Sequence, residues 1–181
     1  IIALSKSTRD KLIKAGINEN KIKVVYGGVD IKKLKIKKEK LKVSAQNSKI
    51  KNIICISRLV KYKKIDDLIK VFSLLREKYS NLTLTIVGQG PEEKRLKKLV
   101  KEKSMQSRVS FLKNLPRKTL IKFLKQSYLF CLPSVIEGFG LVTIEAAACG
   151  IPYVISDIEG KKEISNDGQG GPIFKKRDSK D

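Results

Sequence analysis

Residues 129–156 of the chain read LFCLPSVIEGFGLVTIEAAACGIPYVIS, and the choice of fold class rests on this stretch. Two apolar runs, Leu129–Leu132 and Tyr153–Ser156, have the length of buried strands. Between them, the residues from about Gly140 to Ala148 have the length and apolar character of a short buried helix. A strand, a helix and a second strand in this order form the unit from which helix-covered parallel sheets are built.

The same alternation runs through the rest of the chain. Further strands are expected at Ile22–Tyr26, Asn52–Ser57, Leu82–Val87 and Val109–Leu112. Helices are expected from a cap at Ser5 to about Ala15, from Ile65 to about Tyr79, from Pro91 through Val100 and from Pro116 through Leu124. About five such units without an internal repeat predict an α/β protein with a Rossmann-like, doubly wound parallel sheet. Ligands of such sheets bind outside the carboxyl ends of the strands, so the loops that follow the strands are the candidate sites.

Composition excludes several classes of function. The 181 residues include no histidine, which removes Ser-His-Asp and Cys-His catalysis. No stretch approaches the ~20 consecutive apolar residues of a membrane helix, and no signal-peptide pattern is present. The cysteines, Cys55, Cys131 and Cys149, are odd in number and match no zinc or redox spacing. We therefore expect a reduced, cytoplasmic protein.

The net charge of +22 comes from 40 basic and 18 acidic residues, and 33 of the basic residues are lysine. Nucleic-acid-binding proteins depend more on arginine, so no nucleic-acid partner is expected. The densest run, residues 32–51, holds nine lysines and one acidic residue. Such a run is typical either of a solvated linker or of a segment that contacts anionic lipid headgroups.

The loop after Leu132 combines glycines with a carboxylate. Gly138 and Gly140 let the backbone approach a ligand closely, and the start of the following helix offers free N–H groups suited to phosphate. Glu137 lies on this loop, where it either contacts the ligand or orients the loop. Glu145 is expected to be buried, because its helix is apolar nearly all round, and it either forms an ion pair or accepts hydrogen bonds from ribose hydroxyls.

Two further loops follow predicted strands. Arg58 stands directly at a strand end, with Lys63 five residues on, and the two are interpreted either as phosphate ligands or as solvated charges. The sequence Gly88-Gln89-Gly90-Pro91 lacks the third glycine of a dinucleotide fingerprint. A tight turn before a helix explains these four residues equally well.

Together these motifs resemble the C-terminal half of a family 4 (group 1) glycosyltransferase of the GT-B fold, a two-domain architecture. The resemblance extends from about Ile2 to Phe174, and the motifs occur in the family's order. It rests on Arg58 with Lys63, the Gly88–Pro91 loop, Glu137-Gly138-Phe139-Gly140-Leu141 with Glu145 and Gly150-Ile151-Pro152, and Tyr26-Gly27-Gly28-Val29-Asp30.

The resemblance implies a site for a nucleotide-diphosphate sugar, such as a UDP- or GDP-sugar, and no cofactor. Glu137, Arg58 and Lys63 would be the catalytic residues, with Glu137 at the transferring sugar and the two cations on the diphosphate. Glu145 would bind the ribose hydroxyls. The donor-binding set would be completed by Gly138, Phe139, Gly140 and Leu141 at the diphosphate, by Leu112 and Lys113 at the base, and by Gly88.

The resemblance also implies a reaction, which is transfer of a sugar with retention of configuration to a glycan or lipid-linked acceptor. We expect it in surface polysaccharide or glycoconjugate biosynthesis, in the cytoplasm, with peripheral attachment to an anionic membrane surface on the inner face. No metal is expected, since the sequence has no Asp-x-Asp pair of the kind that metal-dependent transferases use. The alternative is a basic α/β module that binds nucleic acid or a membrane surface and transfers nothing.

By the same resemblance, residues 1–30 would be a remnant of an N-terminal acceptor domain with the interdomain linker. Residues 31–51 would be a lysine-rich linker, and residues 52–181 the nucleotide-sugar-binding domain. The chain would thus be part of a longer enzyme, and residues 1–181 alone are expected to bind the donor and to transfer little or nothing. The chain departs from the family at four positions: Gly27 stands where the family has asparagine, and Lys64, Asn114 and Glu159 stand where it has glycine.

Overall fold

The computed structural model describes residues 1–34, 49–158, 163 and 173–174. The strands are β1 (Ile2–Ala3), β2 (Lys23–Val24), β3 (Lys51–Ile56), β4 (Leu82–Val87), β5 (Val109–Leu112), β6 (Leu129–Leu132), β7 (Tyr153–Ser156) and β8 (Ile173–Phe174). The α-helices are α1 (Lys6–Lys14), α2 (Ile31–Leu34), α4 (Ile65–Lys78), α5 (Glu93–Glu102), α6 (Arg117–Gln126) and α7 (Leu141–Ala148). Two 3₁₀ turns, η1 (Glu19–Lys21) and η2 (Lys61–Lys63), complete the described elements.

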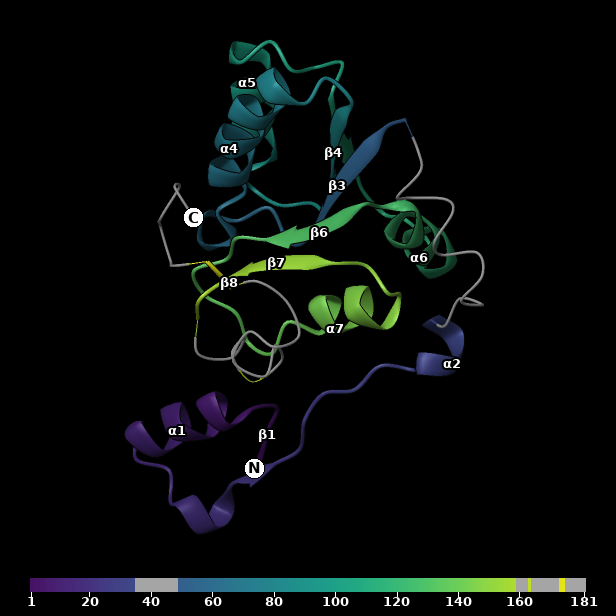
Figure 1. Cartoon of the computed structure of the whole chain (residues 1–181). Helices are drawn as coiled ribbons and strands as arrows, with labels where there is room; N and C mark the ends of the chain where they lie inside the picture. Colours follow the sequence, from purple (N-terminus) through teal and green to yellow (C-terminus); the bar gives the residue numbers. More distant parts are fainter. Residues whose placement is uncertain (35–48, 159–162, 164–172, 175–181) are drawn as a thin grey trace.

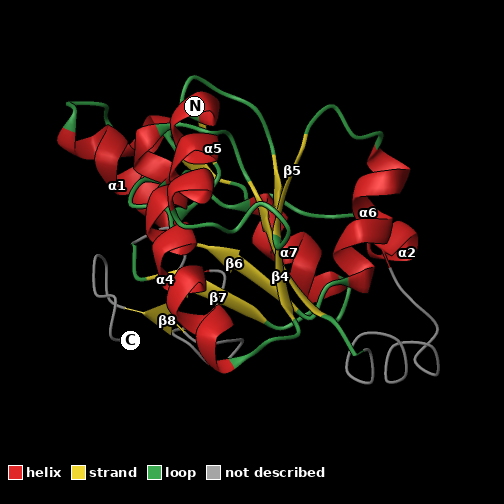
Figure 2. Cartoon of the chain, turned by 90° about the horizontal axis from the view of Figure 1, so that it is seen from above, coloured by secondary structure: helices red, strands yellow, loops and turns green. Residues whose placement is uncertain are grey.

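The main sheet has six parallel strands in the order β5-β4-β3-β6-β7-β8, which confirms the predicted doubly wound architecture (Figure 1). Helices α4 and α5 cover one face of this sheet, and α6 and α7 cover the other (Figure 2). The chain leaves β3 toward β4 and β5 on one side and later returns to β6 on its other side. The direction of winding therefore reverses between β3 and β6, and this is the point at which such sheets bind ligands.

The hydrophobic core lies between the sheet and its helices. Strand β3 buries Ile54 and Cys55 completely, and α4 places Ile69 and Phe72 against the sheet at helical spacing, both at 0% exposure. Full burial of a side chain of this size contributes about 1.5–3 kcal/mol. All three cysteines are buried, and burial raises the pKa of the Cys149 thiol.

Most predicted elements are confirmed. The bounds of β4, β5, β6 and β7 are those predicted, and α1 begins after Ser5, whose hydroxyl accepts a hydrogen bond from Thr8 N at 3.0 Å. Strand β3 begins and ends one residue earlier than expected. Strand β2 is shorter than predicted, and β8 was not predicted, because a strand of two residues leaves no periodic signal in the sequence.

The lysine-rich stretch begins with a packed residue. Leu34 of α2 is only 1% exposed and belongs to the hydrophobic core, so the segment predicted as a linker is anchored at its start. Residues 35–48 lie outside the described part of the chain. The division into units at 31–51 and 52–181 therefore stays a prediction.

Residues 1–26 form a small unit of β1, α1 and β2, and Glu163 and Tyr26 take part in its contacts with the main sheet unit. Glu163 accepts hydrogen bonds from the backbone N–H groups of Lys6 and Ser7 at 3.0 and 2.9 Å, at the N-terminus of α1. Partial burial and a hydrogen bond with Glu163 raise the pKa of Tyr26. The Tyr26 ring in turn packs on Phe139, with 5.8 Å between the ring centroids.

Two departures from the family pattern fall on left-handed backbone. Lys64 has φ 53° and Asn114 has φ 52°, a region in which glycine is free of steric strain. Glycine, which the family resemblance leads one to expect at both positions, would avoid this strain. Asparagine tolerates the conformation better than lysine does, because its short side chain bonds locally to the backbone. Lys64 therefore carries the larger conformational cost.

We predict that Lys64→Gly raises the free energy of unfolding by about 1 kcal/mol, because it removes left-handed strain at that position. The matched control is Lys122→Gly, which puts glycine at an exposed site inside α6 and should lower stability by about 1 kcal/mol. Urea denaturation measures both changes. A loss of stability in Lys64→Gly would contradict the strain argument.

Candidate functional site

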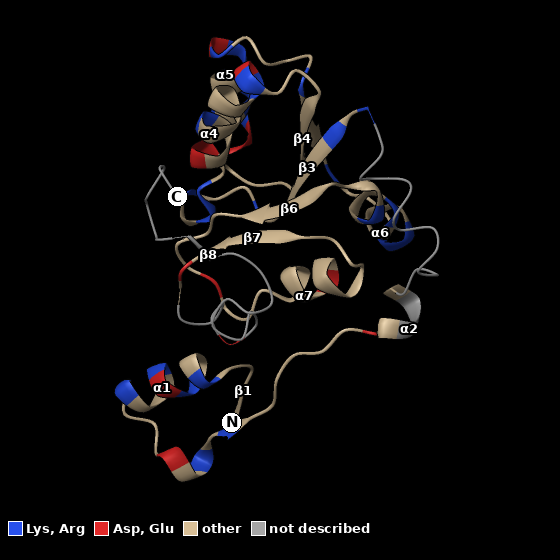
Figure 3. Cartoon of the chain, viewed as in Figure 1, with Lys and Arg blue, Asp and Glu red and all other residues tan. Residues whose placement is uncertain are grey.

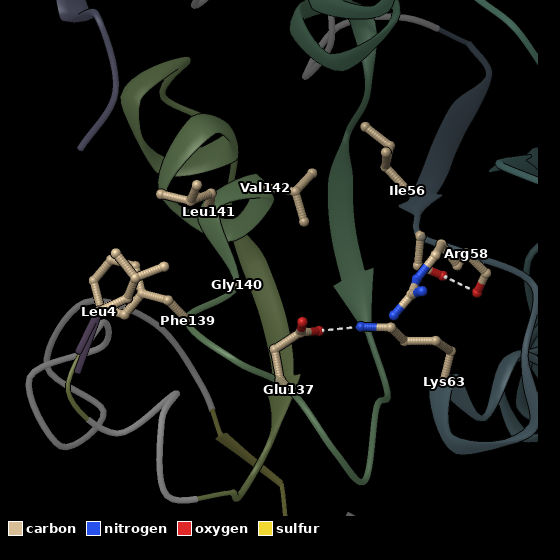
Figure 4. Close-up of a pocket in the computed structure, with 10 residues that line it drawn as sticks. Leu4, Ile56, Arg58, Lys63, Glu137, Phe139, Gly140, Leu141 and Val142 are labelled. Carbon is tan, nitrogen blue, oxygen red and sulfur yellow. Dashed lines mark hydrogen bonds and ion pairs between the residues drawn. The ribbon is translucent and has the colours of Figure 1, made fainter. Parts of the chain in front are cut away.

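A pocket of about 310 Å³ opens at the carboxyl ends of β3 and β6, where the winding of the sheet reverses (Figure 4). Its walls come from the loop after β3, the loop after β6, the start of α7 and the end of the first strand. It is lined by Leu4, Ile56, Ser57, Arg58, Lys63, Glu137, Phe139, Gly140, Leu141 and Val142. The structure thus brings together six of the predicted site residues, which are Arg58, Lys63, Glu137, Phe139, Gly140 and Leu141.

Lys63 and Glu137 form a nearly buried ion pair across the pocket, and Figure 4 shows the two side chains pointing toward each other. The distance from Lys63 Nζ to Glu137 Oε2 is 2.6 Å, and their side chains are 9% and 15% exposed. Ser134 Oγ donates a further hydrogen bond to Glu137 Oε2 at 3.2 Å. Ser134 is in turn fixed by Ser156, whose hydroxyl donates to the Ser134 carbonyl oxygen. The carboxylate of Glu137 is therefore held in one orientation from two sides.

Arg58 adds a positive charge to the pocket beside the Lys63–Glu137 pair. Its side chain is exposed at the pocket, and in the part of the chain that the structure describes it has no carboxylate partner. Its guanidinium donates a hydrogen bond to the Tyr62 hydroxyl. Lys63 is paired with Glu137, so among the described residues that line the pocket Arg58 is the cation without a carboxylate partner.

The N-terminus of α7 faces the same pocket. Gly140 is the N-cap, with φ 73°, and it provides no side-chain acceptor for the first turn. Helix α7 also has no acidic residue in that turn, so no carboxylate of its own offsets the positive end of the helix dipole. The first N–H groups of α7, together with Arg58, make this corner of the pocket suited to an anion.

Gly88 and Gly90 position Arg58 rather than line the pocket. A Cβ atom on Gly88 would lie 1.8 Å from the carbonyl oxygen of Ser57, and one on Gly90 would lie 2.4 Å from that of Leu59. Leu59 N donates to Gln89 O at 2.9 Å, so the loops after β3 and β4 are joined backbone to backbone. The sequence predicted a turn here, and the structure adds a close approach that only glycine permits.

Glu145 faces α6 rather than the pocket. Its side chain is 14% exposed, and its Oε1 lies 2.6 Å from Arg117 Nη2. The hydrogen bond with Glu145 raises the pKa of the Arg117 guanidinium. The ion pair is therefore present, as one of the two interpretations of the sequence expected, and the role at ribose stays a prediction.

Leu112, Lys113 and Gly138 do not line the pocket either. The Leu112 carbonyl oxygen accepts a hydrogen bond from Gly88 N at 2.9 Å, and Lys113 is exposed at the end of β5. These two residues lie two strands away from the switch point. Gly138 precedes the α7 N-terminus, and a Cβ atom there would meet nothing within 4 Å. Glu159 lies outside the described residues.

Sequence reasoning missed two residues, Tyr62 and Arg117. Arg117 had a signal, because arginine is scarce in the chain and this one stands at the start of a helix next to Pro116. Tyr62 had a weaker one, its place between two predicted phosphate ligands. Elsewhere, lysines and arginines are spread over α1, α5 and α6 (Figure 3). The described residues contain no cluster of three side chains that could hold a metal ion.

Comparison with known proteins places these features in one family. The family model described as glycosyl transferases group 1 matches residues 36–181. The capsular polysaccharide biosynthesis glycosyltransferase CapM of Staphylococcus aureus is 30% identical over 194 residues, which covers 99% of this chain and 49% of CapM. A GDP-mannose-dependent alpha-(1-6)-phosphatidylinositol monomannoside mannosyltransferase of Mycolicibacterium smegmatis is 31% identical over 128 residues, or 67% of this chain and 34% of that protein.

The fold also matches solved structures. Anabaena Alr3699/HepE, crystallised in complex with UDP and glucose, superimposes with a TM-score of 0.84 at 25% identity. The match covers 98% of this chain and 50% of that chain. The chain thus spans less than half the length of the two curated relatives. Among the described residues, no helix combines the length and the apolar character needed to cross a bilayer.

We predict that Gly88→Ala lowers the free energy of unfolding by about 2–3 kcal/mol, because the new methyl group must displace the Ser57 carbonyl oxygen. Gly138→Ala is the matched control. Its methyl group meets no neighbour, so stability should change by less than about 0.5 kcal/mol. Thermal unfolding of both variants tests this, and equal stabilities would show that the two loops do not need their close contact.

Proposed function

The chain belongs to the glycosyl transferases group 1 family, and we propose that it forms the donor-binding half of an enzyme that transfers a sugar from a nucleoside-diphosphate sugar. The observation that carries this proposal is the pocket itself. It places Arg58 and the open N-terminus of α7 beside the Lys63–Glu137 pair, at the switch point of the sheet. Two anion-binding groups next to a fixed carboxylate suit a diphosphate joined to a sugar.

The reaction puts charge where the pocket has positive groups. When the bond from the sugar to the diphosphate breaks, the leaving oxygen becomes more negative. Arg58, Lys63 and the first N–H groups of α7 would stabilise that charge, since donors fixed in advance need not reorganise during the reaction. In this proposal no metal ion is needed, because these groups supply the positive charge, and no cofactor takes part.

Glu137 would lie at the transferring sugar. Its contacts with Lys63 and Ser134 keep its carboxylate oriented, so it can stabilise the positive charge that develops on the sugar ring. Lys63 stands between Glu137 and the proposed diphosphate, where it separates two groups of like charge. We propose transfer with retention of configuration, in agreement with the family resemblance.

The rest of the donor would extend along α7 and toward β5. Arg117 holds Oε1 of Glu145, which leaves Oε2 for the ribose hydroxyls. Backbone groups at Leu112 and Lys113 would meet the base. Gly88 would act through Arg58, because its contact with Ser57 fixes the start of the Arg58 loop.

The acceptor is proposed to be a glycan or a lipid-linked sugar, as in surface polysaccharide or glycoconjugate biosynthesis. The similarity to CapM supports a polysaccharide pathway, and the similarity to the mannosyltransferase supports a lipid-linked acceptor. We propose a cytoplasmic enzyme that attaches peripherally to the inner face of the membrane. The exposed lysines Lys118 and Lys122 of α6 support contact with anionic headgroups.

A calorimetric screen of UDP, GDP and ADP against residues 1–181 tests donor binding. We expect one of the three to bind, and Arg58→Ala to weaken it by about 10- to 100-fold, the range for loss of a hydrogen bond to a charged group. Lys122→Ala is the control, because it removes one exposed positive charge outside the pocket. Equal losses in both variants would indicate a general charge effect, and no binding by any nucleotide would overturn the proposal.

Glu137→Gln separates catalysis from binding. In the full-length protein we expect release of nucleoside diphosphate from the donor to fall by about 10²–10³-fold, as when one fixed electrostatic group is removed. Nucleoside-diphosphate affinity should stay the same or rise, because the neutral amide no longer competes for Lys63. If affinity and turnover fell together, Glu137 would be a loop-orienting residue instead.

A further inference from the structure

Tyr62 lies between the two cations of the pocket, and it contacts both. The Arg58 guanidinium donates a hydrogen bond to the Tyr62 hydroxyl, and its central carbon lies 6.0 Å from the centroid of the Tyr62 ring. Lys63 Nζ lies 5.5 Å from the same centroid. One aromatic side chain thus serves as a contact for both positive groups.

The backbone of Tyr62 joins the two loops that form the pocket. Its carbonyl oxygen accepts a hydrogen bond from Val135 N at 2.8 Å. Val135 stands two residues before Glu137, on the loop after β6, whereas Tyr62 belongs to η2 on the loop after β3. Tyr62 is therefore attached through its backbone to the loops on both sides of the switch point.

Arg58 needs such a contact more than Lys63 does. Lys63 is nearly buried and paired with Glu137, while Arg58 is exposed and has no ion pair in the described part of the chain. A free arginine side chain loses rotamer freedom when it binds a ligand, and that loss weakens binding. A hydrogen bond to a ring that is already fixed reduces this loss, and the negative face of the ring offsets repulsion between the two cations.

We propose that Tyr62 is a positioning residue that holds the Arg58 guanidinium toward the diphosphate. The inference rests on the proposed function, because it takes Arg58 as a ligand of the diphosphate. Tyr62 acts through Arg58. Its hydroxyl should therefore matter only when Arg58 is present.

The experiment is a double-mutant cycle on nucleoside-diphosphate affinity, with UDP, GDP and ADP as probes of the 181-residue chain. Tyr62→Phe keeps the ring and removes the hydroxyl, and we expect it to weaken binding about five-fold, the effect of one hydrogen bond. In the Arg58→Ala background the same change should have no further effect. Tyr79→Phe is the control, because Tyr79 is an exposed tyrosine at the end of α4, outside the pocket.

A second variant and a stability measurement exclude a purely structural role. Tyr62→Leu removes the ring as well, so its loss of affinity should exceed that of Tyr62→Phe. The melting temperature of Tyr62→Phe should equal that of the unaltered chain, because the ring still packs.

The outcomes separate the two proposals. Absence of nucleotide binding in the unaltered chain would overturn both. Binding that depends on Arg58 and is unchanged in Tyr62→Phe would overturn only the positioning role. An equal loss on removal of the hydroxyl with and without Arg58 would also overturn it, since Tyr62 would then act independently of Arg58.

Discussion

The architecture depends on the pairing of β3 with two neighbours, β4 on one side and β6 on the other, all three parallel. Because the chain leaves β3 in one direction and returns on its other side, the loops after β3 and β6 diverge from adjacent strand ends. A crevice remains between them that no crossover helix covers. The pocket residues are drawn from both loops, so the strand order determines which side chains meet. Arg58 and Glu137 are neighbours for that reason, although 79 positions separate them in the sequence.

Much of this arrangement was predictable, because buried parallel strands have a clear sequence pattern. Strands β4, β5, β6 and β7 are short apolar runs bounded by glycine, proline or polar residues. Their bounds were therefore predicted correctly from the sequence. The glycines and Glu137 after β6 were identified as a site because strand ends are where parallel sheets bind ligands. The family resemblance then implied which part of the donor each of these residues would contact.

What the sequence did not show depends on packing between distant segments. The contacts of Glu145 with Arg117 and of Lys63 with Glu137 join residues 28 and 74 positions apart, and side-chain geometry decides them. The role of Gly88 was ambiguous for the same reason. A turn is visible in the sequence, whereas the carbonyl oxygen of the neighbouring loop is not. Tyr62 was overlooked because an aromatic residue in a lysine-rich loop has no distinctive pattern.

The hydrogen bonds from Lys6 N and Ser7 N to Glu163 have a mechanical consequence. Residues 1–26 are joined covalently to the main sheet unit only by the extended segment that leads to α2 (Figure 1). One connecting segment alone would leave this unit free to turn, and the hydrogen bonds at the N-terminus of α1 restrain it. Leu4, which follows β1 directly, is part of the pocket wall. The carboxylate of Glu163 therefore restrains the same unit that contributes Leu4 to the pocket wall.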